Sequence, residues 1–338
     1  MTIAPSRIGF SRRGLLAGLA ATPALAALPA PSAAETACAG NPAEQVQAEL
    51  KDAKGTKLVL LGTGGGPGPG RTRRMTSHVM LSNGAAYVLD CGLGVTDQLA
   101  RTGIPFGAVR SIFITHHHPD HNVEYGPLLV IGWVNGLKLS VRAYGPPPLK
   151  QMTEDFLRAY KTTIEFWSED FKTQPLGMID VTEVSGAGPV MQDDNVRVRS
   201  VVVEHPPVKP ALGYRFDFRD RSFAFSGDTT PLDEVAQMAK GADVLVHEAM
   251  YVTGLEDYLR FRIAHGFAAN LDSFMAHMRA DHSPLEAVGR IAAEAGVKTL
   301  VLSHLVPAID SIGDDIWRAA AAKHFKGEII VAHDLMVV

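Results

Sequence analysis

The stretch Thr115-His116-His117-His118-Pro119-Asp120-His121 directly follows the apolar run Ser111-Ile112-Phe113-Ile114. This run is β-branched and aromatic, which predicts a buried strand over 111–115 and a loop that begins with the histidines. In an extended or tightly looped segment, His116 and His118 project to one side. Asp120 and His121 follow on the turn, so the four side chains can divide between two adjacent metal ions.

The density of ligands separates a metal site from a polar loop at this stretch. A lone histidine in a loop is usually a hydrogen-bonding group. Three imidazoles this close together repel one another once protonated, and a fold has little reason to accept that unless a cation holds them. Neutral imidazole and carboxylate ligands suit zinc, with iron or manganese as weaker candidates. The stretch therefore predicts a metal site.

The same stretch resembles the His-x-His-x-Asp-His signature of the metallo-β-lactamase superfamily, matched by His116, His118, Asp120 and His121. The resemblance covers about residues 57–338, which we expect to form the hydrolase domain. It implies an α/β fold, an αβ/βα sandwich of two mixed β-sheets packed face to face. Helices would cover the outer faces, and the metals would lie at one edge.

The composition is that of a globular chain without a general attraction for polyanions. Of its 338 residues, 46% are hydrophobic and 20% are charged, which suffices for the core of one large or two modest domains. The formal net charge of −4 argues against nucleic acid as the main partner.

Residues 1–34 have the organisation of a targeting segment. Arg12 and Arg13 precede an Ala- and Leu-rich stretch that runs to about Leu28, and Ser32-Ala33-Ala34 offers small residues for cleavage. This order is similar to a twin-arginine signal, which implies the twin-arginine export machinery as a partner and the periplasm as the location. The apolar part is short for a membrane span, although an uncleaved anchor stays open. We expect residues 35–56 to be a linker.

The chain has two cysteines, Cys38 and Cys91. In an oxidising periplasm they could pair, but Cys91 ends an apolar run and is as easily a buried free thiol near the site. Both interpretations stay open.

Polar candidate ligands recur where predicted strands end. Four segments end in this way: residues 196–203 before His205, the hairpin 212–225 before Asp228, residues 244–246 before His247 and Glu248, and residues 299–302 before His304. Active sites on layered α/β scaffolds are built on such strand ends.

The superfamily resemblance divides these residues into a two-metal set. It assigns His116, His118 and His205 to one metal and Asp120, His121 and His304 to the other, with Asp228 bridging. Asp120 counts as both a ligand and a catalytic residue. Two zinc ions roughly 3.5 Å apart would hold a shared hydroxide and clamp the attacking and leaving oxygens, and Mn²⁺ or Fe²⁺ could replace zinc. Asp228 in a Gly-Asp-Thr context resembles the phosphodiesterase, glyoxalase II and lactonase branches more than true β-lactamases.

A second pair of motifs resembles the ribonuclease Z, phosphodiesterase and arylsulfatase branch. These motifs are His247-Glu248-Ala249 and His282-Ser283-Pro284. The resemblance implies that His282 donates a proton to the leaving group and that Glu248 orients it. The alternative is that His282 caps a helix, since an Ala- and Val-rich segment follows it.

Three local expectations concern the surroundings of the site. Gly62 to Gly70 forms a loop that resembles the Leu-Gly-Thr-Gly opening of that branch. Arg71, Arg73 and Arg74 follow it and should lie in a solvated patch or face an anionic substrate. A helix over 124–133 should be capped by Asn122.

The stretch 150–180 departs from the ribonuclease branch, whose substrate-binding arm is basic. It holds six acids and four bases, whereas polyanion binding needs a surplus of positive charge. We therefore expect an exported dizinc hydrolase of small phosphodiesters or sulfate esters, with a small-molecule ester substrate and no nucleic acid partner. The alternatives are a lactonase or β-lactamase-type hydrolase of cyclic acyl compounds and a non-catalytic metal-dependent binding protein. A homodimer stays open.

Overall fold

Residues 41–51, 54–68 and 72–338 are described by the structure, a computed structural model of the chain. The twin-arginine pattern, Cys38 and Arg71 lie outside these residues. Within them, no helix has both the length and the apolar character that a membrane crossing requires.

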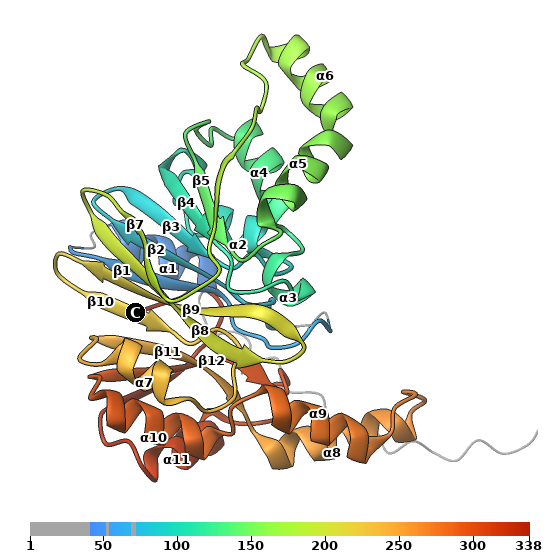
Figure 1. The fold of residues 1–338 in the computed structure, drawn as a ribbon, viewed down its shortest axis with the longest axis vertical. Coiled ribbons are helices and arrows are strands. Elements are labelled where there is room, and N and C mark those ends of the chain that lie inside the picture. The colour runs from blue at the N-terminus through green and yellow to red at the C-terminus, as the bar shows by residue number, and fades with distance from the viewer. Residues whose placement is uncertain (1–40, 52–53, 69–71) are drawn as a thin grey trace, which may run out of the picture. The chain divides into compact units, whose positions relative to one another are not determined.

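Two mixed β-sheets, each with seven strands among the described residues, lie face to face (Figure 1). The first has the order β14 (Met336–Val337), β1 (Lys57–Gly62), β2 (Ser77–Ser82), β3 (Ala85–Leu89), β4 (Val109–Phe113), β5 (Arg142–Gly145) and β6 (Asp180–Glu183). The second has the order β13 (Glu328–Val331), β12 (Thr299–Val306), β11 (Val244–Met250), β10 (Ser222–Phe225), β9 (Val208–Phe218), β8 (Val196–His205) and β7 (Gly188–Gln192).

Helices cover the outer face of each sheet, and their apolar residues form two separate core clusters. The first sheet packs against α1 (Pro42–Lys51), α2 (Val95–Arg101), α4 (Tyr125–Val134), α5 (Leu149–Ala159) and α6 (Lys161–Phe171). The second packs against α7 (Asp233–Ala239), α10 (Leu285–Ala295) and α11 (Asp314–Ala322). The predicted αβ/βα sandwich is thereby confirmed.

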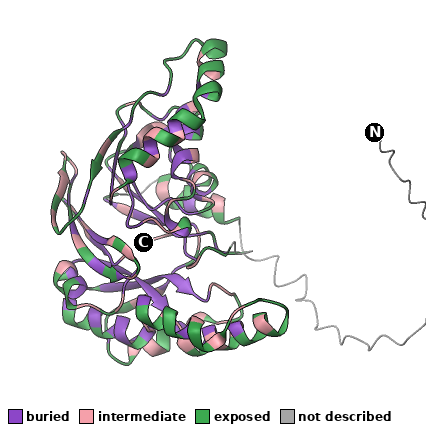
Figure 2. Ribbon diagram, turned by 45° about the vertical axis from the view of Figure 1, so that its right-hand side comes forward, coloured by how far each residue is buried: buried purple, intermediate pink, exposed green. Residues whose placement is uncertain are grey.

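The space between the sheets is filled by a third, aromatic-rich cluster. Phe113 of β4 stacks on Tyr144 with ring centroids 5.0 Å apart and meets Phe216 of the second sheet edge to face at the same distance. Both sheets are buried along most of their central strands (Figure 2). Large rings in edge-to-face contact hold the sheets together without strand pairing.

Two helical pairs project from the layers on the same side of the molecule (Figure 1). We call these pairs the helical arms. One arm consists of α5 and α6, and the other of α8 (Val252–Ala264) and α9 (Leu271–Asp281). The second pair has its own small cluster, in which Leu255, Leu259 and Met275 pack against Met250 and Val306 at the ends of β11 and β12. The α8–α9 pair is therefore anchored beside the strand ends that carry the candidate site.

The local expectations from the sequence include one clear confirmation and two corrections. The Asn83-Gly84 turn joins β2 to β3, and both residues have positive φ as such a turn requires. Asn122 does not cap α4, because its side chain contacts His117 Nδ1 at 3.0 Å instead. β11 and β12 continue through the candidate ligands rather than ending before them.

A carboxylate in the second sheet forms hydrogen bonds with the start of the first sheet. Asp220, in the β9–β10 turn, accepts hydrogen bonds from the backbone N–H of Thr56 at 2.7 Å and from its hydroxyl at 2.6 Å. Thr56 directly precedes β1 of the other sheet. Gly55 has φ +76°, and a Cβ there would come within 2.5 Å of the Asp220 carboxylate, so this approach requires glycine.

Asp220→Ala should lower the free energy of unfolding at pH 7 by about 1 kcal/mol, because two hydrogen bonds to an ionised carboxylate are lost. The Thr56 hydroxyl lowers the pKa of Asp220 below its usual value of 3.8. The carboxylate therefore stabilises the fold above the unfolded-state pKa, and this contribution disappears as the pH falls through the lower folded-state pKa. Urea unfolding of metal-free protein from pH 7 to pH 3 measures the difference, and a difference that does not change with pH would contradict the prediction.

Candidate metal centre

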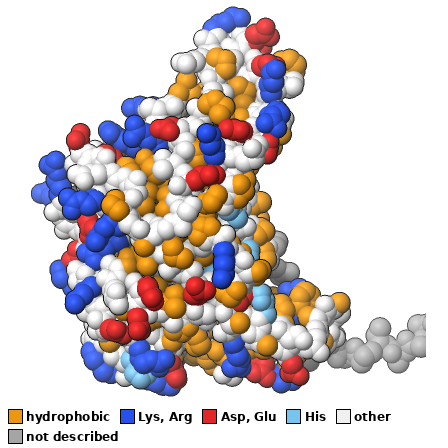
Figure 3. All heavy atoms as spheres, viewed as in Figure 1, with side chains coloured by type: hydrophobic (Ala, Val, Ile, Leu, Met, Phe, Trp, Pro, Cys, Tyr) orange, Lys and Arg blue, Asp and Glu red, His pale blue; other side chains and the backbone are white. Residues whose placement is uncertain are grey.

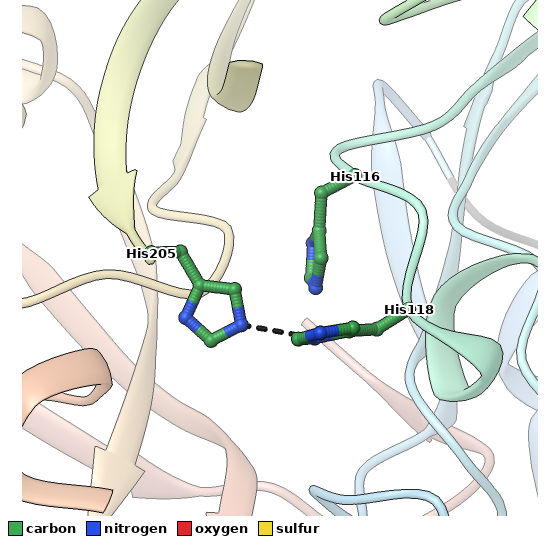
Figure 4. Close-up of side chains that lie close together, drawn as sticks. All are labelled: His116, His118 and His205. Carbon is green, nitrogen blue, oxygen red and sulfur yellow. Dashed lines mark hydrogen bonds between the residues drawn. The ribbon is translucent and has the colours of Figure 1, made fainter. Parts of the chain in front are cut away.

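Three imidazoles from both sheets converge at the edge that faces the helical arms (Figure 4). His116 and His118 lie in the loop after β4, and His205 ends β8. One ring nitrogen of each lies within 4.8 Å of the other two. His205 Nε2 is 3.0 Å from His118 Nδ1, and His205 Nδ1 donates to the backbone carbonyl of Asp281 at 2.9 Å. The second bond fixes the ring of His205 with Nε2 toward the cluster.

A second set consists of Asp120, His121, Asp228 and His304, all buried and again within 4.8 Å. Asp228 Oδ2 is 3.1 Å from His304 Nε2 and 3.3 Å from His121 Nε2. The same oxygen is 3.8 Å from His205 Nε2 and 3.9 Å from His116 Nε2. One carboxylate oxygen therefore lies between the two sets, which is the geometry that a bridging ligand needs.

The chemistry of these residues fits two divalent metal ions. His116 Nε2, His121 Nε2 and Asp228 Oδ1 are buried and have no hydrogen-bond partner among the described residues. Buried polar atoms are nearly always satisfied, so several orphans pointing to one region indicate a ligand. Burial raises the pKa of Asp228, but His304 and His121 hold it well below its usual range, so the carboxylate is ionised and able to bind a cation.

Strand irregularities aim the ligands of the second set. The register between β11 and β12 shifts between Glu248 and Ala249, and His304 has φ +45°. Irregularities of this kind re-aim a side chain within a strand, and they are common beside active sites. The loop after β1 then closes on the ligands, because a Cβ on Gly65 would come within 2.7 Å of His304 Nδ1. The adjacent N–H of Gly66 donates to Asp120 Oδ2 at 2.8 Å.

Asp90 is a supporting residue that the sequence analysis missed. Its Oδ2 accepts from His121 Nδ1 at 2.8 Å, and its Oδ1 accepts the backbone N–H of Thr115 at 2.8 Å. A carboxylate on the far nitrogen of a ligating histidine fixes its tautomer and raises its basicity. The available signal was position: Asp90 follows β3, which runs parallel to β4, so it lies at the same edge as the histidines.

A buried carboxylate holds His282 beside both sets. His282 Nδ1 is 2.9 Å from Glu248 Oε2, and Glu248 Oε1 accepts the backbone N–H of Thr229 at 2.6 Å. The His282 ring stacks over His304 with centroids 5.7 Å apart. Burial lowers the pKa of His282, but the Glu248 carboxylate more than offsets this, and the net shift is upward. His282 follows the last residue of α9 and is not the N-terminal cap of α10, which is Pro284.

All nine residues that the sequence singled out lie together at one edge: His116, His118, Asp120, His121, His205, Asp228, Glu248, His282 and His304. Arg73 corrects an expectation, because it is buried and donates to the Thr63 hydroxyl and the carbonyl of Ala332. It is therefore committed to the loop and does not face a substrate. Arg74 is exposed. Histidine side chains gather where the surface is hollowed between the two helical arms (Figure 3).

Comparison with known proteins places this fold and site in a class. A family model described as "Beta-lactamase superfamily domain" matches residues 86–305. The chain belongs to the metallo-β-lactamase superfamily, as a metal-dependent hydrolase, and its curated relatives include proteins named ribonuclease Z. Those of Mycobacterium bovis (strain BCG / Pasteur 1173P2) and Mycobacterium tuberculosis (strain H37Rv) are 33% and 32% identical, over 82% of this chain and 96% of theirs.

Solved structures share the fold at lower identity. The metallo-beta-lactamase fold protein YhfI from Bacillus subtilis has a TM-score of 0.63 and 20% identity, covering 84% of this chain and all of that one. Human tRNase Z, short form, has a TM-score of 0.60 and 21% identity, covering 83% and 98%. Zn²⁺-bound PqqB from Methylobacterium extorquens has a TM-score of 0.60 and 14% identity, covering 83% and 99%.

Proposed function

We propose that this chain is an exported, two-metal hydrolase of small phosphodiesters or sulfate esters. The observation that carries the proposal is the Glu248–His282 pair, which lies within 4.8 Å of His304 and beside two complete ligand sets. An acid held this close to metal ligands is needed when the leaving group is a poorly stabilised alkoxide. Zinc is the proposed metal, with manganese or iron as substitutes.

The protein's own residues would divide the chemistry. When bound, two divalent ions supply a lowered pKa for water and neutralise charge on the ester oxygens. Asp120 and Asp228, which follow strands of opposite sheets, would help to hold the ions together with the imidazoles. His282 holds its Nδ1 proton toward Glu248, which leaves Nε2 to deliver a proton to the departing oxygen. Glu248 is held in turn by the N–H of Thr229, so the pair is oriented before substrate arrives.

The charge of the helical arms supports a small substrate over RNA. The arm formed by α5 and α6 pairs several of its charges internally, as in Arg158–Asp155 and Lys161–Glu165. It also exposes two aromatic rings, with Phe166 64% and Phe171 59% exposed, beside its charged side chains. Binding an RNA backbone draws on a surplus of Lys and Arg, which this arm lacks. The relatives named ribonuclease Z favour phosphodiester chemistry, and the arm argues for a different substrate.

Hydrolysis of lactones or other cyclic acyl compounds is the competing activity. Asp228 in its Gly-Asp-Thr context suits that chemistry too, and acyl transfer from a ring needs no separate acid. The Glu248–His282 pair favours the ester proposal. Export rests on the twin-arginine pattern of residues 1–34, and a homodimer is the oligomer to test.

A substrate panel tests the proposal on full-length protein loaded with zinc or manganese. An activated aryl phosphodiester, an aryl sulfate, a γ-lactone and a structured RNA with a 3′ extension would be assayed side by side against free metal. We expect turnover of the aryl phosphodiester or aryl sulfate well above the free-metal rate. No turnover of either would overturn the proposal, and preferential cleavage of the RNA would overturn the small-substrate part.

A further inference from the structure

The middle histidine of the signature stretch, His117, is the one imidazole of that stretch that neither ligand set uses. It lies between His116 and His118, whose rings converge with that of His205 (Figure 4). His117 is half-buried, and it belongs to none of the possible ligand groups among the described residues. An imidazole this close to two ligands is either a further ligand or a group that holds the other two in place.

Both ring nitrogens of His117 have partners outside the ligand sets. Nε2 donates to the backbone carbonyl of Pro146 at 2.8 Å, and Nδ1 lies 3.0 Å from the side-chain amide nitrogen of Asn122. A carbonyl oxygen only accepts, so Nε2 carries the proton. Nδ1 therefore accepts the hydrogen bond that the Asn122 amide donates. Because both nitrogens are occupied, the ring has no atom left for a metal ion.

The backbone around His117 has few anchors of its own. The carbonyl groups of Thr115 and His118 accept backbone hydrogen bonds, from β9 and from the end of α3 (Pro119–Asn122) respectively. Between them, neither His116 nor His117 forms a backbone–backbone hydrogen bond with any described residue. A segment without such bonds opens easily unless side chains hold it. The His117 side chain is thus an anchor of the segment that carries two metal ligands.

The partners of His117 lie on two structural elements that are themselves well held. Pro146 is buried after β5, and its carbonyl also accepts the backbone N–H of Leu149, the first residue of α5, at 3.1 Å. A carbonyl oxygen has two lone pairs, and here both are used. Asn122 is the last residue of α3, which carries two ligands of the second set. His117 therefore ties its segment to the start of one helical arm and to α3.

We propose that His117 is a positioning residue, which fixes the directions of His116 and His118 toward the first metal. The inference rests on the two-metal part of the proposed function and not on its substrate. Removing a group that holds a metal ligand in place typically lowers metal affinity about 10- to 100-fold. His116 and His118 belong to one set and flank the anchor directly. The first metal should therefore depend on His117 more than the second metal does.

Histidine side-chain NMR of the full chain tests the bonding pattern directly. In metal-free protein, we expect the long-range proton–nitrogen correlations of His117 to show the tautomer with the proton on Nε2. Added zinc should shift the signals of His116, His118 and His205 and leave those of His117 nearly unchanged. A proton on Nδ1 of His117, or a ligand-like shift of its nitrogens with zinc, would overturn this inference alone. If no ring responds to zinc, the two-metal part of the proposed function fails and this inference fails with it.

Paired substitutions separate positioning from general stability. His117→Ala removes both hydrogen bonds and should weaken the first metal by about 10-fold or more, with a much smaller change at the second metal. His117→Gln places an amide nitrogen near the position of Nε2. It should restore most of the lost affinity, because it can still donate to the Pro146 carbonyl. Zinc titrations followed by the ring signals of His205 and His304 report the two sites separately.

The matched control is His265→Ala. His265 also donates a ring hydrogen bond to a backbone carbonyl at 2.8 Å, but it is exposed and belongs to neither ligand set. This change should leave both metal affinities as they are. An unchanged first-metal affinity in His117→Ala, or equal losses at the two metals, would show that His117 does not position the first set. A His117→Gln protein that binds no better than His117→Ala would show the same.

Discussion

Asp228→Asn will remove most of the hydrolytic activity, by about 100-fold or more, while the protein stays folded. The Asp228 Oδ2 atom lies 3.1 to 3.9 Å from four ligand nitrogens of the two sets, so it is placed to contact both metals. An asparagine of the same size has no charge to offer two cations. Three imidazoles would still hold the first metal, whereas affinity for the second should fall about 10- to 100-fold.

Metal analysis and thermal melting measure this result. The variant should retain about one metal per chain after dialysis and should keep the far-UV spectrum of the parent. Asp194→Asn is a matched control, since Asp194 is exposed in the turn before β8 and should leave metal content unchanged. If Asp228→Asn binds two metals tightly and hydrolyses normally, Asp228 is only a turn residue and the two-metal proposal is wrong.

His282→Ala will slow the cleavage of esters with poor leaving groups by about 10²- to 10⁴-fold and will barely affect activated aryl esters. The reason is that an activated phenolate leaves without a proton, whereas an alkoxide does not. Glu248→Gln should also slow the cleavage of esters with poor leaving groups. The change removes the negative partner of His282 Nδ1 and alters the orientation of the ring. A plot of log kcat against leaving-group pKa measures both effects.

His265→Ala provides the matched histidine control. His265 is exposed directly after α8, and its side chain donates a hydrogen bond to the carbonyl of Phe261, so its loss should leave the plot unchanged. If His282→Ala cleaves every ester as fast as the parent enzyme does, no separate acid acts. That result would favour the acyl-transfer alternative.

The candidate centre was predictable from sequence because its ligands follow strong local patterns. The His-x-His-x-Asp-His stretch follows the apolar run 111–114, and the later ligands each follow a predicted strand. Parallel strands bring such ends to one edge of a sheet. The sharing of one metal by His116 and His205 was implied only by the resemblance to the superfamily, and the structure brings the two side chains together from opposite sheets.

Features that depend on long-range contacts could not be predicted. Asp90 looked like the end of a strand, and only its neighbour β4 places it against His121. Arg73 looked like part of a solvated cluster, and its burial follows from contacts with Thr63 and Ala332, the latter more than 250 residues away. Asn122 has the composition of a cap, but the nearby ring of His117 competes for its side chain.

The strand β14 has a consequence for how the chain acquires its structure during synthesis. Val59 of β1 pairs with Val337 of β14, so the first sheet is completed only by residues that follow the whole second sheet. The centre is likewise incomplete until His304 has been synthesised, since this residue of β12 completes the ligand set of Asp120 and His121. A nascent chain that has produced only the first half has neither a finished sheet nor a finished ligand set. Folding must therefore close long loops late, which slows it, and neither half is an independent folding unit.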